Sequence, residues 1–185
     1  MPKRGNNKTF IFKGFHGRKS ITIPDNSFVK AVINSYVYNC KNGGGEPFKK
    51  AVHSDKTIYI DDARLWDGNT EFQNPGNQPT IYWNPEMGII TTDGGLQSPA
   101  TRLDHEMDHA IDYLYNAHEH NINNDPGNPV GTGPGYDPQF DTKEERRVIT
   151  GSEVKTALSN RESIRHDHKG TPYRTAGPTT TKPYN

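Results

Sequence analysis

The segment His105-Glu106-Met107-Asp108-His109 constrains this chain more than any other feature. Two histidines four positions apart lie on the same face of a helix, so both imidazoles can reach one metal ion. A Zn²⁺ ion held in this way has the intervening Glu106 beside a water that it binds. The pattern therefore predicts a zinc hydrolase, with His105 and His109 as metal ligands and Glu106 as the general base.

The residues around this motif are typical of a helix that is buried on one side. Ser98 can act as its N-cap, and Pro99 suits the first helical position. An apolar stripe follows at helical spacing and consists of Leu103, Met107, Ala110, Ile111 and Leu114. His105, Glu106 and His109 fall off this stripe, so they should face a different environment from the core. A polar helix whose histidines only face solvent fits this context less well.

Composition limits the classes of partner. With 185 residues the chain is one domain, or one domain with tails. Lys plus Arg and Asp plus Glu number 22 each, which gives no overall basic field for nucleic acid or an anionic membrane. No apolar run approaches the roughly 18 residues of a membrane span, and residues 1–8 lack an apolar signal segment. We expect a soluble protein without membrane insertion, without a nucleic-acid partner and without an export signal of its own.

Cysteine usage limits the metal ligands. The single cysteine, Cys40, excludes an internal disulfide and a zinc site made of several thiolates. Any metal must therefore be held by histidine and carboxylate side chains.

The order of elements predicts an α+β, zincin-like fold. Residues 1–8 should be a disordered start, 9–175 the domain and 176–185 a flexible tail. Strands are expected over 9–12, 19–23, 57–60, 80–83 and 88–92, the last two forming a hairpin, and helices over 25–38, 99–116 and 142–158. Asp25 or Asn26 should cap the first helix and Asp141 or Thr142 the last. The strand before the motif helix should offer a free edge to an extended peptide.

A catalytic zinc takes three protein ligands and leaves one position open. No third histidine follows His109 at short spacing. His118 and His120 lie in a predicted loop from about 118 to 140, where a solvated pair is the more usual reading.

Carboxylates on the second helix are the remaining candidates for the third ligand. Glu144 and Glu145 also have an ordinary explanation, because acidic residues are favoured in the first turn of a helix. Glu153 follows Gly151, which would permit close packing against the motif helix. We therefore favour Glu153, with Glu145 as the alternative.

Hydrolysis of an amide also needs a donor for the developing oxyanion. His168 and Arg165 are the preferred candidates, and His166, Tyr173 and Tyr136 are further ones. Asp112 could accept a hydrogen bond from a ligand imidazole and so orient it.

Three segments together resemble a known family. They are the motif itself, the Gly-Ser-Glu segment that ends at Glu153, 44 positions after His109, and the stretch Glu162-Ser-Ile-Arg-His-Asp-His-Lys-Gly170. They resemble the metallopeptidase toxin domains of type VI secretion effectors, in particular the C-terminal domain of certain VgrG-type spike proteins. More distantly, the chain is similar to effector zinc metallopeptidases that are injected into host cells. The resemblance covers roughly residues 80 to 175.

This resemblance implies that His105, His109 and Glu153 bind zinc and that Glu106 is the general base. It also implies that the domain is fused to or carried by a secretion spike and is delivered into a competing bacterium. It would act there on a peptide or protein substrate in the periplasm, and a cognate immunity protein could neutralise it.

Three other functions fit parts of the sequence. A metal-dependent nuclease toxin could use His118-Glu-His120 and His166-Asp-His168, but the balanced charge offers little to bind phosphates. A non-catalytic module could use zinc only to join two helices, which would require a closed set of four ligands. Within the hydrolases, an amidase acting on cell-wall peptides is an alternative to a protein-cleaving enzyme.

Overall fold

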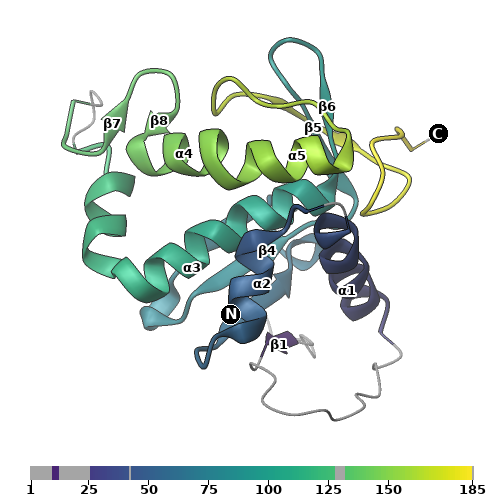
Figure 1. Cartoon of the computed structure of the whole chain (residues 1–185), viewed down its shortest axis with the longest axis horizontal. Coiled ribbons are helices and arrows are strands. Elements are labelled where there is room, and N and C mark those ends of the chain that lie inside the picture. Colours follow the sequence, from purple (N-terminus) through teal and green to yellow (C-terminus); the bar gives the residue numbers. More distant parts are fainter. Residues whose placement is uncertain (1–9, 13–25, 42, 128–131, 185) are drawn as a thin grey trace.

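Helix α3 (Pro99–Asn124) is the central element of the computed structural model, which describes residues 10–12, 26–41, 43–127 and 132–184. Helix α4 (Lys143–Val148), a π-helical turn (Ile149–Glu153) and helix α5 (Val154–Asn160) lie along α3 in the opposite direction (Figure 1). Helices α1 (Ser27–Cys40) and α2 (Glu46–His53) also pack against α3. The fold is α+β, as predicted.

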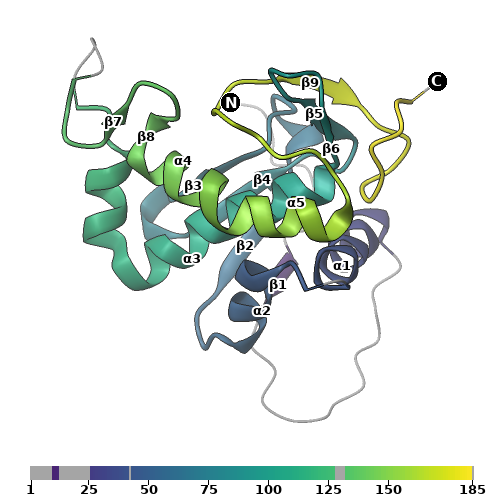
Figure 2. The same cartoon turned by 45° about the horizontal axis from the view of Figure 1, so that its top comes forward.

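The strands form two small sheets and a hairpin. The first sheet has the order β1 (Phe10–Phe12), β2 (Ile58–Asp62), β4 (Thr80–Trp83) and β3 (Glu71–Gln73), with β2 and β4 parallel and the outer pairs antiparallel. The second is antiparallel, with the order β6 (Leu96–Gln97), β5 (Met87–Ile90) and β9 (Thr171–Arg174), and lies near the start of α3 (Figure 2). Strands β7 (Tyr136–Asp137) and β8 (Asp141–Thr142) form the hairpin, and two 3₁₀ turns span Ala63–Leu65 and Pro75–Asn77.

The hydrophobic core fills the space between α1, α2, the first sheet and the inner face of α3. Leu103 and Met107 have no exposed surface, and Trp83 donates a hydrogen bond from Nε1 to the carbonyl oxygen of Pro99 over 2.9 Å. The apolar stripe predicted for the motif helix is confirmed, because its members pack in or against this core. Burial of this stripe fixes α3 and therefore fixes which of its side chains face α4 and the second sheet.

Side-chain caps define the starts of three helices. Asn26 caps α1 by accepting from the backbone N–H of Phe28 and Val29. Ser98 caps α3, with Pro99 in the first helical position, and Thr142 caps α4. Each was one of the caps predicted from the sequence.

The chain differs from the sequence prediction in its strands. The predicted hairpin of 80–83 with 88–92 is wrong, because β4 and β5 belong to different sheets. Strands β3, β6 and β9 were not predicted. Helix α3 continues through a kink at Asn116 to Asn124, so His118 and His120 are on a helix and not in a loop. The predicted strand at 19–23 and the predicted start at 1–8 lie outside the described residues.

The end of the chain folds back on the second sheet. Ala176 donates to the carbonyl oxygen of Lys182, and Tyr184 donates to that of Arg174, both over 2.9 Å. The described part of the expected tail, residues 176–184, is therefore tied to β9. Among the described residues, no helix is long and apolar enough to cross a bilayer.

Candidate metal centre

The first half of α3 carries the motif, and its polar side chains are buried. His105, Glu106 and His109 are 4 %, 8 % and 3 % exposed. The Nε2 atoms of His105 and His109 lie 3.0 Å apart. Both imidazoles therefore converge on one point, as the spacing of four residues predicts.

Glu145 is the third group at this point. Its Oε2 lies 3.1 Å from Nε2 of His105, and its Oε1 lies 3.3 Å from Nε2 of His109. Oε2 is buried and accepts no hydrogen bond in the described structure. Thr142 accepts a hydrogen bond from the backbone N–H of Glu145 over 3.1 Å, so the helix cap positions this residue. Glu145 was the alternative third ligand in the sequence prediction.

Glu153 lies at the other ring nitrogen of His105. Its Oε2 is 2.7 Å from Nδ1 of His105, and its Oε1 accepts from Gln97 and from Nε of Arg165, both over 2.9 Å. It does not join the group formed by His105, His109 and Glu145, whose ligand atoms all lie within 4.8 Å of one another. This position differs from the expectation that Glu153 is the third ligand.

Glu144 has the same relation to His109. Its Oε1 lies 3.0 Å from Nδ1 of His109 and accepts from Nη2 of Arg147 over 2.6 Å. His109, His120 and Glu144 form a second group that could hold a cation. The Arg147 guanidinium already supplies a positive charge to that carboxylate. Asp112 was expected to orient a ligand imidazole, but its Oδ2 lies 3.2 Å from Nδ1 of His120.

These contacts determine the tautomer of both motif histidines. A carboxylate only accepts hydrogen bonds, so Nδ1 of each ring carries the proton and Nε2 of the neutral ring is left with a lone pair. Nη2 of Arg165 also lies 3.1 Å from Nδ1 of His105, but the Glu153 oxygen is closer. Two lone pairs and a carboxylate oxygen without a donor thus meet in one buried place. A divalent cation satisfies all three, and this set of nitrogen and oxygen donors suits zinc.

The opposite charges at this point shift the pKa values of His109 and Glu145. Burial lowers the pKa of His109, but the carboxylates of Glu145 and Glu144 outweigh burial and raise it well above its ordinary value. Burial raises the pKa of Glu145, and the two histidines outweigh it, so that pKa is held well below its ordinary value. Glu145 therefore carries a negative charge that needs a positive partner, either a protonated histidine or a metal ion.

The π-helical turn brings both glutamates onto the face that meets α3. Glu145 and Glu153 are eight residues apart, and a regular α-helix turns by about 100° per residue, which would separate their directions by about 80°. A π turn takes up one extra residue. The two side chains are then equivalent to residues seven apart, which share a face.

Asp108, inside the motif, holds this turn against α3. Its Oδ1 accepts from Nη1 of Arg147 over 3.0 Å, and its Oδ2 accepts from the hydroxyl of Ser152. Gly151 does not mark a close approach, because a Cβ there would meet no atom within 4 Å. The roles of Asp108 and Arg147 were not predicted from the sequence. The signals that could have indicated them are a carboxylate within the motif and an arginine three positions after Glu144.

A cleft of about 200 Å³ lies over the motif. Its lining includes His105 and Glu106, together with Thr70, Arg102, Arg165 and His168. His168 is held by Asp141, with Nδ1 to Oδ2 at 2.8 Å, and its Nε2 lies 3.4 Å from Oε2 of Glu145. The two preferred oxyanion donors, His168 and Arg165, therefore both lie at the cleft.

The other candidate donors have different partners. Tyr173 donates from its hydroxyl to the carbonyl oxygen of Thr181 over 2.9 Å, and His166 is an exposed side chain 4.0 Å from Asp93. Tyr136, which is 39 % exposed, lies in β7. None of these three lines the cleft.

The strand expected to offer a free edge, residues 88–92, corresponds to β5, whereas the edge strand that contacts His109 is β3. Strand β5 is paired on both sides, by β6 and β9, so it has no free edge. Strand β3 ends the first sheet, and its Phe72 ring stacks on His109 with ring centroids 6.5 Å apart.

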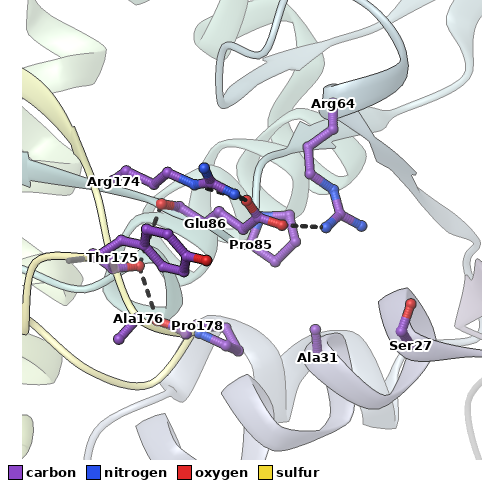
Figure 3. A pocket seen from close by; sticks show the side chains of 11 residues that line it. Ser27, Ala31, Arg64, Pro85, Glu86, Arg174, Thr175, Ala176 and Pro178 are labelled. Atoms are coloured by element: carbon purple, nitrogen blue, oxygen red, sulfur yellow. Dashed lines mark hydrogen bonds and ion pairs between the residues drawn. The ribbon is translucent and has the colours of Figure 1, made fainter.

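A second pocket, of about 360 Å³, lies between α1 and the end of the chain (Figure 3). Its charged groups satisfy one another: the Glu86 carboxylate accepts from Arg64 over 2.7 Å and from Arg174 over 2.8 Å. None of the motif residues lines it. This pocket is therefore separate from the cleft over α3.

Comparison with known families assigns the chain to one of them. A model of the peptidase family M91, described as effector protein, matches residues 17–176. The chain belongs to this family. The match includes α3, α4 and the segment that reaches Arg165 and His168, and membership makes the chain a peptidase effector. No curated protein and no solved structure matches the chain.

Proposed function

We propose that this M91 effector is a zinc-dependent metallopeptidase in which His105, His109 and Glu145 hold the metal and Glu106 is the general base. The observation that supports it most strongly is the convergence of two imidazole nitrogens and a carboxylate oxygen that accepts no hydrogen bond. Three protein ligands leave one position open, which is typical of catalytic and not of structural zinc.

Zinc in this place would supply a Lewis acid towards the amide carbonyl and lower the pKa of water to about 7. Glu106 accepts the proton of the attacking water and returns a proton to the leaving amine. His168 lines the same cleft, and because its Nδ1 donates to Asp141, it is the imidazolium form of the ring that would donate from Nε2 to the developing oxyanion. Glu153 and Glu144 fix the tautomers of the two histidines.

Strand β3 has no further strand at its outer edge among the described residues, and this edge provides a place for an extended substrate. Backbone N–H and C=O groups at a sheet edge pair with a peptide by strand addition. Phe72 of β3 stacks on His109, so a peptide paired there would run past the metal ligands. The bond that is cut would belong to a protein or to a cell-wall peptide.

The resemblance to type VI secretion effectors supports a proposal on delivery. The domain would be carried by a secretion spike into a competing bacterium, act in the periplasm and be neutralised by a cognate immunity protein. Expression in a bacterium tests this part: periplasmic wild type should stop growth, while cytoplasmic wild type and periplasmic Glu106→Gln should not. Equal toxicity of periplasmic wild type and Glu106→Gln would contradict it.

Cleavage tests the proposed chemistry. Zinc-loaded wild type and Glu106→Gln are incubated with a bacterial protein mixture and with purified cell-wall peptides, and new amino termini are identified by mass spectrometry. We expect cleavage by wild type and at least a 100-fold slower reaction with Glu106→Gln at unchanged zinc content, because the residue is a base and not a ligand. Equal rates for the two proteins, or no cleavage by wild type, would refute the proposal.

A further inference from the structure

Arg102 is the one arginine at the cleft that has no carboxylate partner among the described residues. Arg165 is paired with Glu153. Arg102 instead donates from Nη1 to the carbonyl oxygen of Met87 over 3.3 Å and from Nη2 to that of Thr70 over 3.4 Å. Both distances exceed the usual range for an N–H···O hydrogen bond. The arginines of the second pocket differ, since Arg64 and Arg174 share the carboxylate of Glu86 (Figure 3).

The surroundings of Arg102 disfavour the positive charge of its guanidinium. A guanidinium has five N–H donors, and the two carbonyl oxygens use only part of them. Arg102 also lies near the start of α3, where the helix dipole disfavours a positive charge. Burial lowers the pKa of Arg102 to about 10, although the charge of Glu106 opposes this shift. At neutral pH the side chain therefore keeps a positive charge that the described residues offset only in part.

The location of this charge points to the substrate. Arg102 is four residues before Glu106, so the two lie on the same face of α3 one turn apart, and both line the cleft. A group bound by Arg102 would thus lie within one helical turn of the general base. Arginine binds carboxylates with two parallel N–H···O bonds, which fixes the orientation of the bound group.

We propose that Arg102 binds a carboxylate of the substrate next to the bond that is cut, which makes this effector selective for peptides that carry a carboxylate at that place. The inference rests on the proposed function and adds the substrate class. The carboxylate has two sources in a peptide: the side chain of Asp or Glu, or a free C-terminus. Arg102 is here a specificity-determining residue, and the reaction itself still depends on Glu106.

Binding is measured first, because it does not require turnover. The zinc-loaded Glu106→Gln protein is immobilised and exposed to a synthetic peptide library in which each peptide occurs with Glu or Gln at one position, and with a free or an amidated C-terminus. Mass spectrometry compares the peptides retained by this protein and by the double variant Arg102→Gln/Glu106→Gln. We expect at least a 10-fold enrichment of one carboxylate class on the first protein and its loss on the second. The Glu/Gln pairs and the free/amidated pairs identify the source.

Turnover gives the second readout. Arg102→Gln should lower kcat/KM for the preferred carboxylate peptide by about 10- to 100-fold more than it lowers that of its amide counterpart. Arg102→Lys, which keeps the charge and loses the planar fork, should recover part of the preference. Arg161→Gln, an exposed arginine at the end of α5, is the control and should leave the preference unchanged. Circular dichroism and thermal unfolding verify that each variant is folded.

The outcomes separate the two proposals. Equal retention of carboxylate and amide peptides by the Glu106→Gln protein, including no retention of either, overturns the role of Arg102. If Glu106→Gln abolishes cleavage while wild type shows no carboxylate preference, only the Arg102 proposal fails. If wild type cleaves nothing, the proposed function fails, and the retention experiment still decides what Arg102 binds.

Discussion

The Glu153 carboxylate lies 2.7 Å from Nδ1 of His105, while the Glu145 carboxylate lies 3.1 Å from Nε2 of the same ring. One imidazole is thus held between two glutamates from the same helical segment. Glu145 faces the point where the two motif histidines converge, and Glu153 fixes the proton and the direction of the ring. The distinction between a metal ligand and the residue that orients a ligand is the basis of the following prediction.

Glu153→Gln should weaken metal binding without abolishing it. The amide is a poorer acceptor for Nδ1–H, and partners of this kind typically contribute about 10- to 100-fold to metal affinity. Zinc affinity is measured by competition with a chelator, and the stoichiometry at saturation should stay at one per chain. Glu86→Gln is the control. It removes a carboxylate that accepts hydrogen bonds from two arginines, but this carboxylate lies outside the site, so the substitution should not change zinc affinity. Complete loss of zinc in Glu153→Gln would instead assign Glu153 as a ligand.

Thr142→Ala should loosen the helix that carries Glu145. The Thr142 hydroxyl caps α4 by accepting the backbone N–H of Glu145 over 3.1 Å. Loss of such a cap typically costs about 1 kcal/mol of unfolding free energy. We expect that decrease in urea unfolding, together with weaker zinc binding, and recovery of both in Thr142→Ser. A stable Thr142→Ala protein with unchanged zinc affinity would show that the cap does not position Glu145.

Asp137→Asn should change the pH dependence of stability. The hydrogen bond from Arg146 lowers the pKa of Asp137 to about 2, against its ordinary value of about 3.9. A carboxyl group with a lowered folded-state pKa stabilises the fold above its unfolded-state pKa, and this contribution is lost as the pH falls towards the folded-state pKa. Because Arg146 is half-exposed, we expect a difference of only about 1 kcal/mol at pH 7.

This difference between wild type and Asp137→Asn should shrink from pH 4 downward. Urea unfolding at pH 7, 4 and 3 measures it, and the asparagine can still accept the backbone N–H groups of Gln139 and Phe140. A difference that stays constant over this range would show that the ion pair with Arg146 does not contribute.

The local features of the site could be predicted from the sequence, but its third ligand could not. Helix α3, its cap at Ser98 and the convergence of His105 and His109 follow from spacing and local chemistry. The choice between Glu145 and Glu153 depends on the π turn between them, which changes the direction of one relative to the other. No periodicity in the sequence marks that turn. Gly151, the reason to favour Glu153, makes no close contact.

The strands were harder to predict than the helices. Strands β3 and β6 have three and two residues, too few to show an alternating pattern. Strand β9 pairs with β5 across more than 80 residues of chain, so its partner could not be inferred locally. The free edge next to the site was consequently expected at the wrong strand.

The most direct test of the account is a crystal structure of the zinc-loaded protein with data collected at the zinc absorption edge. We predict one strong anomalous peak about 2.0–2.2 Å from Nε2 of His105, Nε2 of His109 and a carboxylate oxygen of Glu145, with a fourth position open. Glu153 should remain hydrogen-bonded to Nδ1 of His105. A peak bonded to Glu153, or a peak at His109, His120 and Glu144 alone, would contradict the proposed metal centre.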